Sequence, residues 1–133
     1  MSYAAGPDAD PVPDAARGVI ATLDDKNPAN RTALVMARIG LGRVMVHGGE
    51  AREAIPVIET AVASARVHLA ASVVRFVHAL VALGQALTAA GEQDRARGVL
   101  HEAVAANEAL PAPSERLRAA AQKALADVQG GAR

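Results

Sequence analysis

Residues 41–61, LGRVMVHGGEAREAIPVIETA, and residues 83–103, LGQALTAAGEQDRARGVLHEA, share one pattern of small and large apolar residues, and this pattern decides the fold. The second segment begins 42 residues after the first, at position 83 against position 41. Seven pairs match at this offset: Leu41 and Leu83, Gly42 and Gly84, Met45 and Leu87, Gly49 and Gly91, Ala54 and Ala96, Ile58 and Leu100, Ala61 and Ala103. Self-similarity at such a period indicates an array of stacked structural repeats.

Each repeated position has a physical reason in a hairpin of two helices. The glycine after each leucine has no side chain, so the second helix can approach the first closely. The alanines at 54 and 96 accept this approach, and the large residues at 58 and 100 fill the next layer. The glycines at 49 and 91 suit the left-handed conformation that ends a helix and turns the chain. The repeat packing is therefore assigned to Leu41, Gly42, Ala54, Ile58, Leu83, Gly84, Ala96 and Leu100.

This order of residues resembles the tetratricopeptide repeat (TPR), although Met45 and Leu87 stand where that family often has Tyr. The period is also longer than the usual length of about 34 residues. Longer versions are similar to those of kinesin light chains and of the C-terminal arrays of bacterial signalling regulators. The resemblance covers residues 31–110 and implies an all-α fold in which antiparallel helix hairpins stack as a short right-handed superhelix.

The flanking segments extend the pattern to about six helices in one domain. We expect a disordered leader at 1–12, a single helical domain at 13–129 with repeats at 31–68 and 72–110, and a flexible tail at 130–133. The expected helices are 13–25, 28–47, 50–66, 70–89, 92–109 and a capping helix at 113–129. The turn near His68 rests on the repeat alone, because no Gly or Pro stands between Arg66 and Ser72. Pro56 conflicts with a helix interior, and a helix start near Arg52 would put it almost in the first turn.

Composition narrows the classes of function. The chain has 133 residues, 14 basic and 14 acidic side chains, no Cys, and aromatic residues at only 2% of positions. Few aromatic rings disfavour sites that stack sugars, bases or flat cofactors. A balanced charge with no evident basic patch predicts no binding to nucleic acid or to anionic membranes. The absence of Cys, of a signal segment and of a membrane-spanning apolar run favours a soluble cytoplasmic protein.

No catalytic or metal-binding pattern stands out. The histidines, His47, His68, His78 and His101, contain no pair three or four residues apart with an adjoining glutamate, as a helical zinc site would have. The serines lack a nucleophile elbow, and Gly40-Leu41-Gly42 lies within a predicted helix without a preceding strand. The sequence therefore predicts a protein that is not an enzyme and that holds no metal or cofactor.

The resemblance implies a concave groove lined by the first helix of each repeat. Carried over by position, the groove residues are Met36, Ile39, Arg43, Val46 and His47 in the first repeat and His78, Val81, Gln85 and Thr88 in the second. Chaperone-binding members of the family clamp a terminal carboxylate with Lys and Asn, but Ile39, Arg43, His78 and Ala82 occupy the corresponding places here. The expected partner is instead another protein, through an amphipathic helix or a mostly apolar peptide with one acidic group.

Three alternatives to an adaptor with an open groove remain. The apolar groove residues could be core, covered by the N-terminal or the final helix, since terminal repeats cover apolar faces. The same surface could join two copies as a homodimer. A regulatory module that senses a small ligand or peptide is the third.

Overall fold

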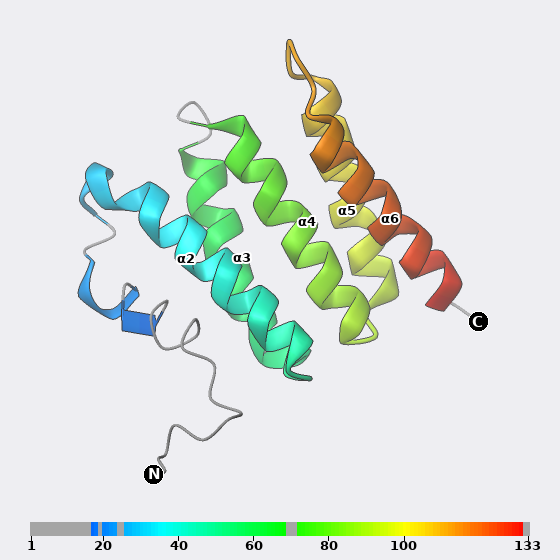
Figure 1. Ribbon diagram of the computed structural model, residues 1–133, viewed down its shortest axis with the longest axis horizontal. Helices are drawn as coiled ribbons and strands as arrows, with labels where there is room; N and C mark the ends of the chain where they lie inside the picture. Colours follow the sequence, from blue (N-terminus) through cyan, green and yellow to red (C-terminus); the bar gives the residue numbers. More distant parts are fainter. Residues whose placement is uncertain (1–16, 19, 24–25, 69–71, 132–133) are drawn as a thin grey trace.

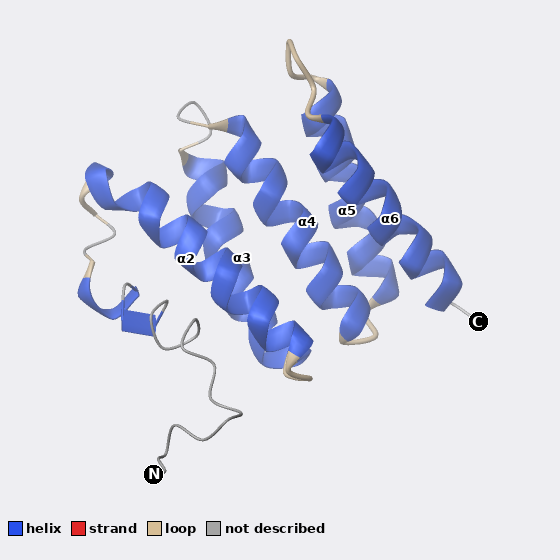
Figure 2. Ribbon diagram, in the orientation of Figure 1, coloured by secondary structure: helices blue, strands red, loops and turns tan. Residues whose placement is uncertain are grey.

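Five complete helices alternate between two layers. The structure, a computed structural model, describes residues 17–18, 20–23, 26–68 and 72–131. The helices are α2 (Pro28–His47), α3 (Ala51–Val67), α4 (Val73–Ala89), α5 (Gln93–Glu108) and α6 (Glu115–Gly131). In Figure 1, α2, α4 and α6 lie side by side in front, and α3 and α5 lie behind them. Figure 2 shows helices joined by short connections, with no strand among the described residues.

The observed boundaries confirm the all-α fold and follow the 42-residue repeat. Helix α2 has the expected bounds, and α3, α4 and α5 begin or end within three residues of theirs. The turn expected near His68 is present, since α3 ends at Val67 and His68 caps it. Helix α6 begins two residues later than expected and continues to Gly131, into the segment expected to be a tail. The leader at 1–12 and much of the helix at 13–25 lie outside the described residues; residues 17–18 and 20–22 are helical.

Polar caps explain where three of the helices begin. The Asn27 side chain accepts a hydrogen bond from the Ala29 backbone N–H at 3.0 Å, and Pro28 follows in the first turn. Ser72 Oγ accepts from the Arg75 N–H at 3.1 Å, and Ser114 Oγ accepts from the Leu117 N–H at 3.2 Å. Each cap satisfies a backbone donor that has no partner within its own helix.

Two pairs of glycines have the roles in turns and in close helix packing that the sequence predicts. The residue that faces each packing glycine differs from the one expected. Gly49 and Gly91 have φ of 83° and 86°, the left-handed conformation that a side chain disfavours. At Gly42 and Gly84 a Cβ would overlap the side chains of Ile58 and Leu100. The close approach is therefore made by the large residue of the second helix, not by the alanine before it.

Pro56 is a genuine exception to local helix preference. We expected it almost in the first turn, but α3 begins at Ala51 and Pro56 lies inside the helix. A proline there cannot donate to the carbonyl of Arg52. Pro56 is on the exposed side of α3, where solvent can reach that carbonyl, so the lost hydrogen bond is less costly than in the core.

Helix α4 is the centre of the molecule, as its two apolar faces predict. It packs against α2, α3, α5 and α6, and most of its residues are buried. All eight residues assigned to repeat packing are buried. No described helix covers the outer face of the layer formed by α2, α4 and α6 (Figure 1).

Candidate functional site

A groove runs along α4 between α2 and α6, made of three adjoining cavities. The first, of about 490 Å³, lies between Met36, Val74 and Arg116. The second, of about 180 Å³, lies between Arg43, His78 and Arg116. The third, of about 300 Å³, extends from Arg43 toward His47 and Lys123. Because neighbouring cavities share lining residues, they form one continuous surface, which we call the groove.

The groove contains most of the residues that the sequence placed there. Seven of them line the three cavities: Met36, Arg43, Val46, His47, His78, Val81 and Gln85. Ile39 does not reach the groove, because it is 2% exposed in the core. Thr88 lines none of these cavities, and its hydroxyl donates to the carbonyl of Gly84 at 2.8 Å.

Part of the expected groove floor is thus core, and part is open. Val81 is 5% exposed and lies at the bottom of the second cavity, whereas Met36 is 41% exposed. The described N-terminal residues do not cover the groove: Arg17 and Ile20 line a separate cavity with Arg38 and Pro56. Helix α6 forms one wall of the groove instead of folding across it.

The wall formed by α6 was missed from the sequence. We expected α6 to be a capping helix and did not assign Arg116 or Lys123 to the groove; both are exposed, and both line it. The repeat contains the missing signal, since Arg116 is 42 residues after Val74 and Lys123 is 42 after Val81. Extending the same positions to the third first-helix would have placed both cations correctly.

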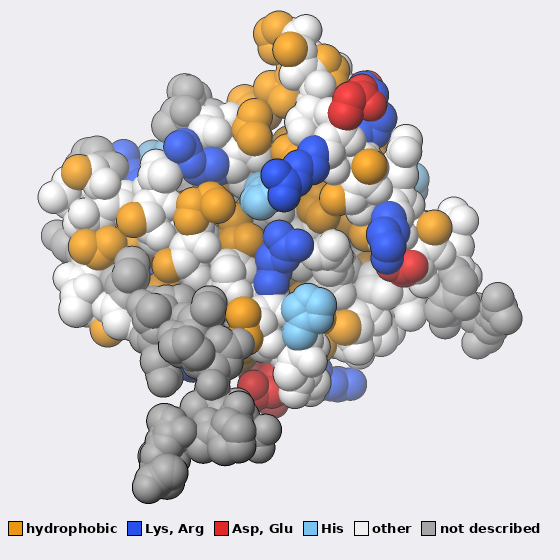
Figure 3. Space-filling model, in the orientation of Figure 1, with side chains coloured by type: hydrophobic (Ala, Val, Ile, Leu, Met, Phe, Trp, Pro, Cys, Tyr) orange, Lys and Arg blue, Asp and Glu red, His pale blue; other side chains and the backbone are white. Residues whose placement is uncertain are grey.

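The two layers differ in their balance of charge. Helices α2 and α4 contain four arginines, Arg31, Arg38, Arg43 and Arg75, and no Asp or Glu. Helices α3 and α5 carry both signs of charge, with four arginines, Arg52, Arg66, Arg95 and Arg97, beside five acidic residues, Glu53, Glu59, Asp94, Glu102 and Glu108. In Figure 3 the blue and pale-blue side chains gather over the middle of the α2–α4–α6 face, while red ones lie toward its edges. A chain of zero net charge therefore presents a basic face, which contradicts the expectation of no basic patch.

Ion pairs join the two helices of the other layer, whereas two of the groove cations, Arg43 and Arg116, have no such partner among the described residues. Arg66 makes a two-pronged pair with Glu102 at 2.7 and 3.2 Å, and Arg95 pairs with Glu59 at 2.7 Å. These side chains are substantially exposed, so each pair contributes at most about 1 kcal/mol. Within the described part of the chain, Arg43 and Arg116 make no ion pair or side-chain hydrogen bond.

His78 lies where the groove cations converge. Its partial burial lowers the pKa of the imidazole below the ordinary value of 6.5, and the positive charges of Arg43 and Arg116 lower it further. The neutral imidazole is therefore favoured in the folded chain. Arg43 comes from α2 and Arg116 from α6, so three helices bring their basic groups to one point.

We expect His78 to make the chain less stable in mild acid. The unfolded chain takes up this proton at about pH 6.5, before the folded chain does, so stability is complete above that pH and falls as the pH drops through it. The melting temperature of His78→Gln should fall less than that of the wild type between pH 7.5 and pH 5.5. Differential scanning fluorimetry measures both melting temperatures. An equal fall in the two proteins would show that His78 takes up its proton at the same pH in the folded and unfolded chain.

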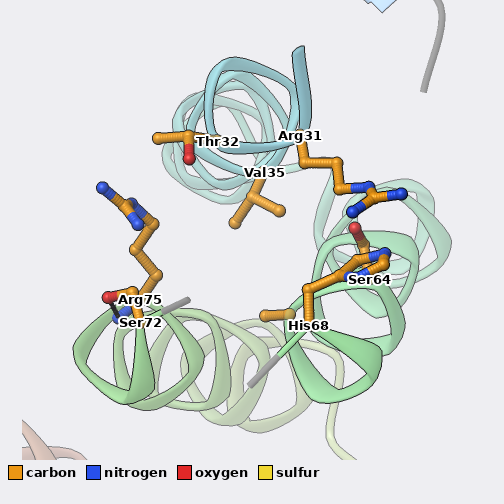
Figure 4. A pocket seen from close by; sticks show the side chains of 8 residues that line it. Arg31, Thr32, Val35, Ser64, His68, Ser72 and Arg75 are labelled. Carbon is orange, nitrogen blue, oxygen red and sulfur yellow. Dashed lines mark hydrogen bonds between the residues drawn. The ribbon is translucent and has the colours of Figure 1, made fainter. Parts of the chain in front are cut away.

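A further cavity, of about 160 Å³ and separate from the three cavities of the groove, adjoins the end of the groove (Figure 4). Val35 of α2 points into it, and Arg31 and Arg75 flank it from opposite sides. The buried Nε of Arg31 has no hydrogen-bond partner. In the second repeat the equivalent of Ala65 is Asn107, whose side chain hydrogen-bonds to the backbone of Ser114. In the first repeat the smaller Ala65 lines the cavity at the corresponding position.

Other classes of site have little support in the described residues. No cluster of three or more His, Asp or Glu side chains there is suited to hold a metal ion. None of the described helices combines the length and the apolar character needed to cross a membrane.

Comparisons with protein-family models, with curated proteins and with solved structures found no match to this chain. The resemblance to the tetratricopeptide repeat thus rests on the chain's own residues and remains a prediction.

Proposed function

We propose that the chain is a protein-interaction module of TPR-like architecture, which binds a helix or peptide of a partner protein in the groove and catalyses no reaction. The observation that carries the proposal is an open apolar and basic groove in which Arg43 and Arg116 have no acidic partner among the described residues. A partner would cover Met36 and Val74, the exposed apolar side chains in the groove.

The position of the groove also supports this role. Helices α2, α4 and α6 present equivalent faces side by side, so a long segment can contact all three at once. In arrays of stacked helical repeats, such extended concave surfaces are the usual binding surface. Peptide recognition of this kind needs an apolar groove and a few polar contacts that fix orientation.

Capture with matched variants tests the proposal. We expect Met36→Glu combined with Arg43→Glu to reduce recovery of a specific partner by roughly tenfold, because it places two negative charges in the groove. The control combines Arg52→Glu with Val67→Glu. It makes the same two changes of charge, one at an arginine and one at an apolar residue, on exposed sites of α3. Both proteins should keep the helical circular dichroism spectrum. Val81→Asp is unsuitable, since it would bury a charge at a core position.

The pattern of recovery decides the outcome. Equal recovery with the groove and control variants would contradict the proposal. Recovery of the chain itself as the only specific partner would favour a homodimer, and light scattering at several concentrations would then show a mass that rises toward twice that of one chain.

A further inference from the structure

The groove has an apolar end and a basic middle. At one end, Met36 and Val74 are 41% and 48% exposed and line one cavity together with Arg75. His78 and Arg116 border both this cavity and the next one. Along the groove, Arg43, His78 and Arg116 surround the next cavity. A ligand that satisfies both regions must carry an apolar group and a negative charge at a fixed separation.

The basic middle of the groove is suited to bind an anionic group. Arg43 and Arg116 come from opposite walls, and their positive charges both act on His78 between them. Like charges held close together are unfavourable unless an anion joins them. No acidic side chain lines this cavity, so the described part of the chain does not supply that anion.

We infer that the groove takes an acidic amphipathic helix of a partner protein, with one carboxylate among Arg43, His78 and Arg116 and one apolar side chain on Met36 and Val74. This inference rests on the proposed function and specifies its partner. Met36 and Arg43 are seven residues apart on α2, which is about 10 Å along a helix. A partner helix lying along α2 would therefore carry its apolar and acidic residues about seven positions apart.

A nucleic acid fits the same charges less well. Single strands are held by aromatic side chains that stack on bases, together with a row of cations along the backbone. The groove contains no Phe, Tyr or Trp among its lining residues, and the accessible surface of its first cavity is more apolar than polar. An acidic protein segment matches both the cations and the apolar end.

Protonation of His78 would make the affinity for this partner helix depend on pH. A carboxylate seated beside the imidazole favours its charged form, against the effect of Arg43 from α2 and Arg116 from α6. Binding then takes up a proton, so affinity should be higher at pH 6 than at pH 8. His78→Gln should remove most of that difference.

A displayed library of helix-favouring 16-residue peptides provides the test. We expect peptides selected on the wild-type chain to be enriched in Asp or Glu about seven positions from a large apolar residue. A selected peptide should bind Arg43→Glu roughly tenfold more weakly, and it should bind the control Arg52→Glu normally. Replacing the peptide's acidic residue by Arg should restore binding to Arg43→Glu.

The other outcomes distinguish failure of this inference from failure of the proposed function. Selected peptides that lose binding on Met36→Glu but show no acidic enrichment would overturn the inference and leave the groove as a peptide site. A library without any peptide sensitive to Met36→Glu or Arg43→Glu would count against the proposed function itself. Binding of a 20-nucleotide oligo-dT that is lost on Arg43→Glu would replace the acidic helix with a nucleic acid.

Discussion

Replacing Leu100 by Ala should lower the free energy of unfolding by about 2–5 kcal/mol, the range for large core residues cut to alanine. Leu100 of α5 is fully buried at 0% exposure and packs directly over Gly84 of α4. The substitution would leave a cavity at the point where the second hairpin is closed. Urea denaturation followed by circular dichroism measures the change.

The same site allows a double-mutant cycle with a predicted sign. Gly84→Ala alone should destabilise the chain by about 1–3 kcal/mol, because the added methyl group overlaps Leu100. In the Leu100→Ala background the methyl group has space, so the double variant should lose less than the sum of the two single changes by about 1–3 kcal/mol.

A third glycine provides the control for this cycle. Gly98 lies within α5, and a Cβ there would meet nothing within 4 Å. Gly98→Ala should therefore raise stability by up to about 1 kcal/mol, the gain in helix propensity alone. Additive effects at Gly84 and Leu100, within about 0.5 kcal/mol, would contradict the close packing of α4 on α5.

Replacing Asn107 by Ala should lower the free energy of unfolding by about 2–4 kcal/mol, because it leaves buried polar groups without partners. Asn107 is 1% exposed, and its side chain bonds both backbone groups of Ser114. The amide Nδ2 donates to the carbonyl of Ser114 at 3.0 Å, and Oδ1 accepts from its N–H at 3.1 Å. These two bonds hold the turn from α5 to α6, and thus one wall of the groove.

The matched control for this change is Asn27→Ala. Asn27 is an exposed helix cap with one hydrogen bond, to the Ala29 N–H, so its loss should cost about 1 kcal/mol. Urea denaturation of both variants compares them directly. Equal losses would show that Asn107 contributes no more than an ordinary cap.

The repeat could be predicted from the sequence because glycine and alanine are needed wherever two helix backbones come close. Gly42, Gly49 and their counterparts gave the two hairpins and most helix boundaries. The alanine predicted to face each packing glycine was the wrong partner, since a periodic pattern does not show which residue of the facing helix points inward. That partner is Ile58 or Leu100, and the adjoining alanine is not the residue that blocks a side chain.

The groove was predictable on two helices and missed on the third. Most groove residues between Met36 and Gln85 were placed by the repeat, but α6 was interpreted only as a capping helix, so Arg116 and Lys123 were not assigned to the groove. The basic face was missed because the net charge of the whole chain is zero. Charge counted helix by helix would have shown that α2 and α4 contain no acidic residue.

Site-specific photo-crosslinking tests the central claim most directly. A photoreactive residue at Met36 lies in the groove, and one at Val67, the most exposed large apolar residue described, lies on α3 outside it. In the producing cells, we predict one major adduct to another protein from position 36, absent from position 67 and lost when Arg43→Glu is added. The same adducts from both positions, or an adduct unaffected by Arg43→Glu, would contradict the account.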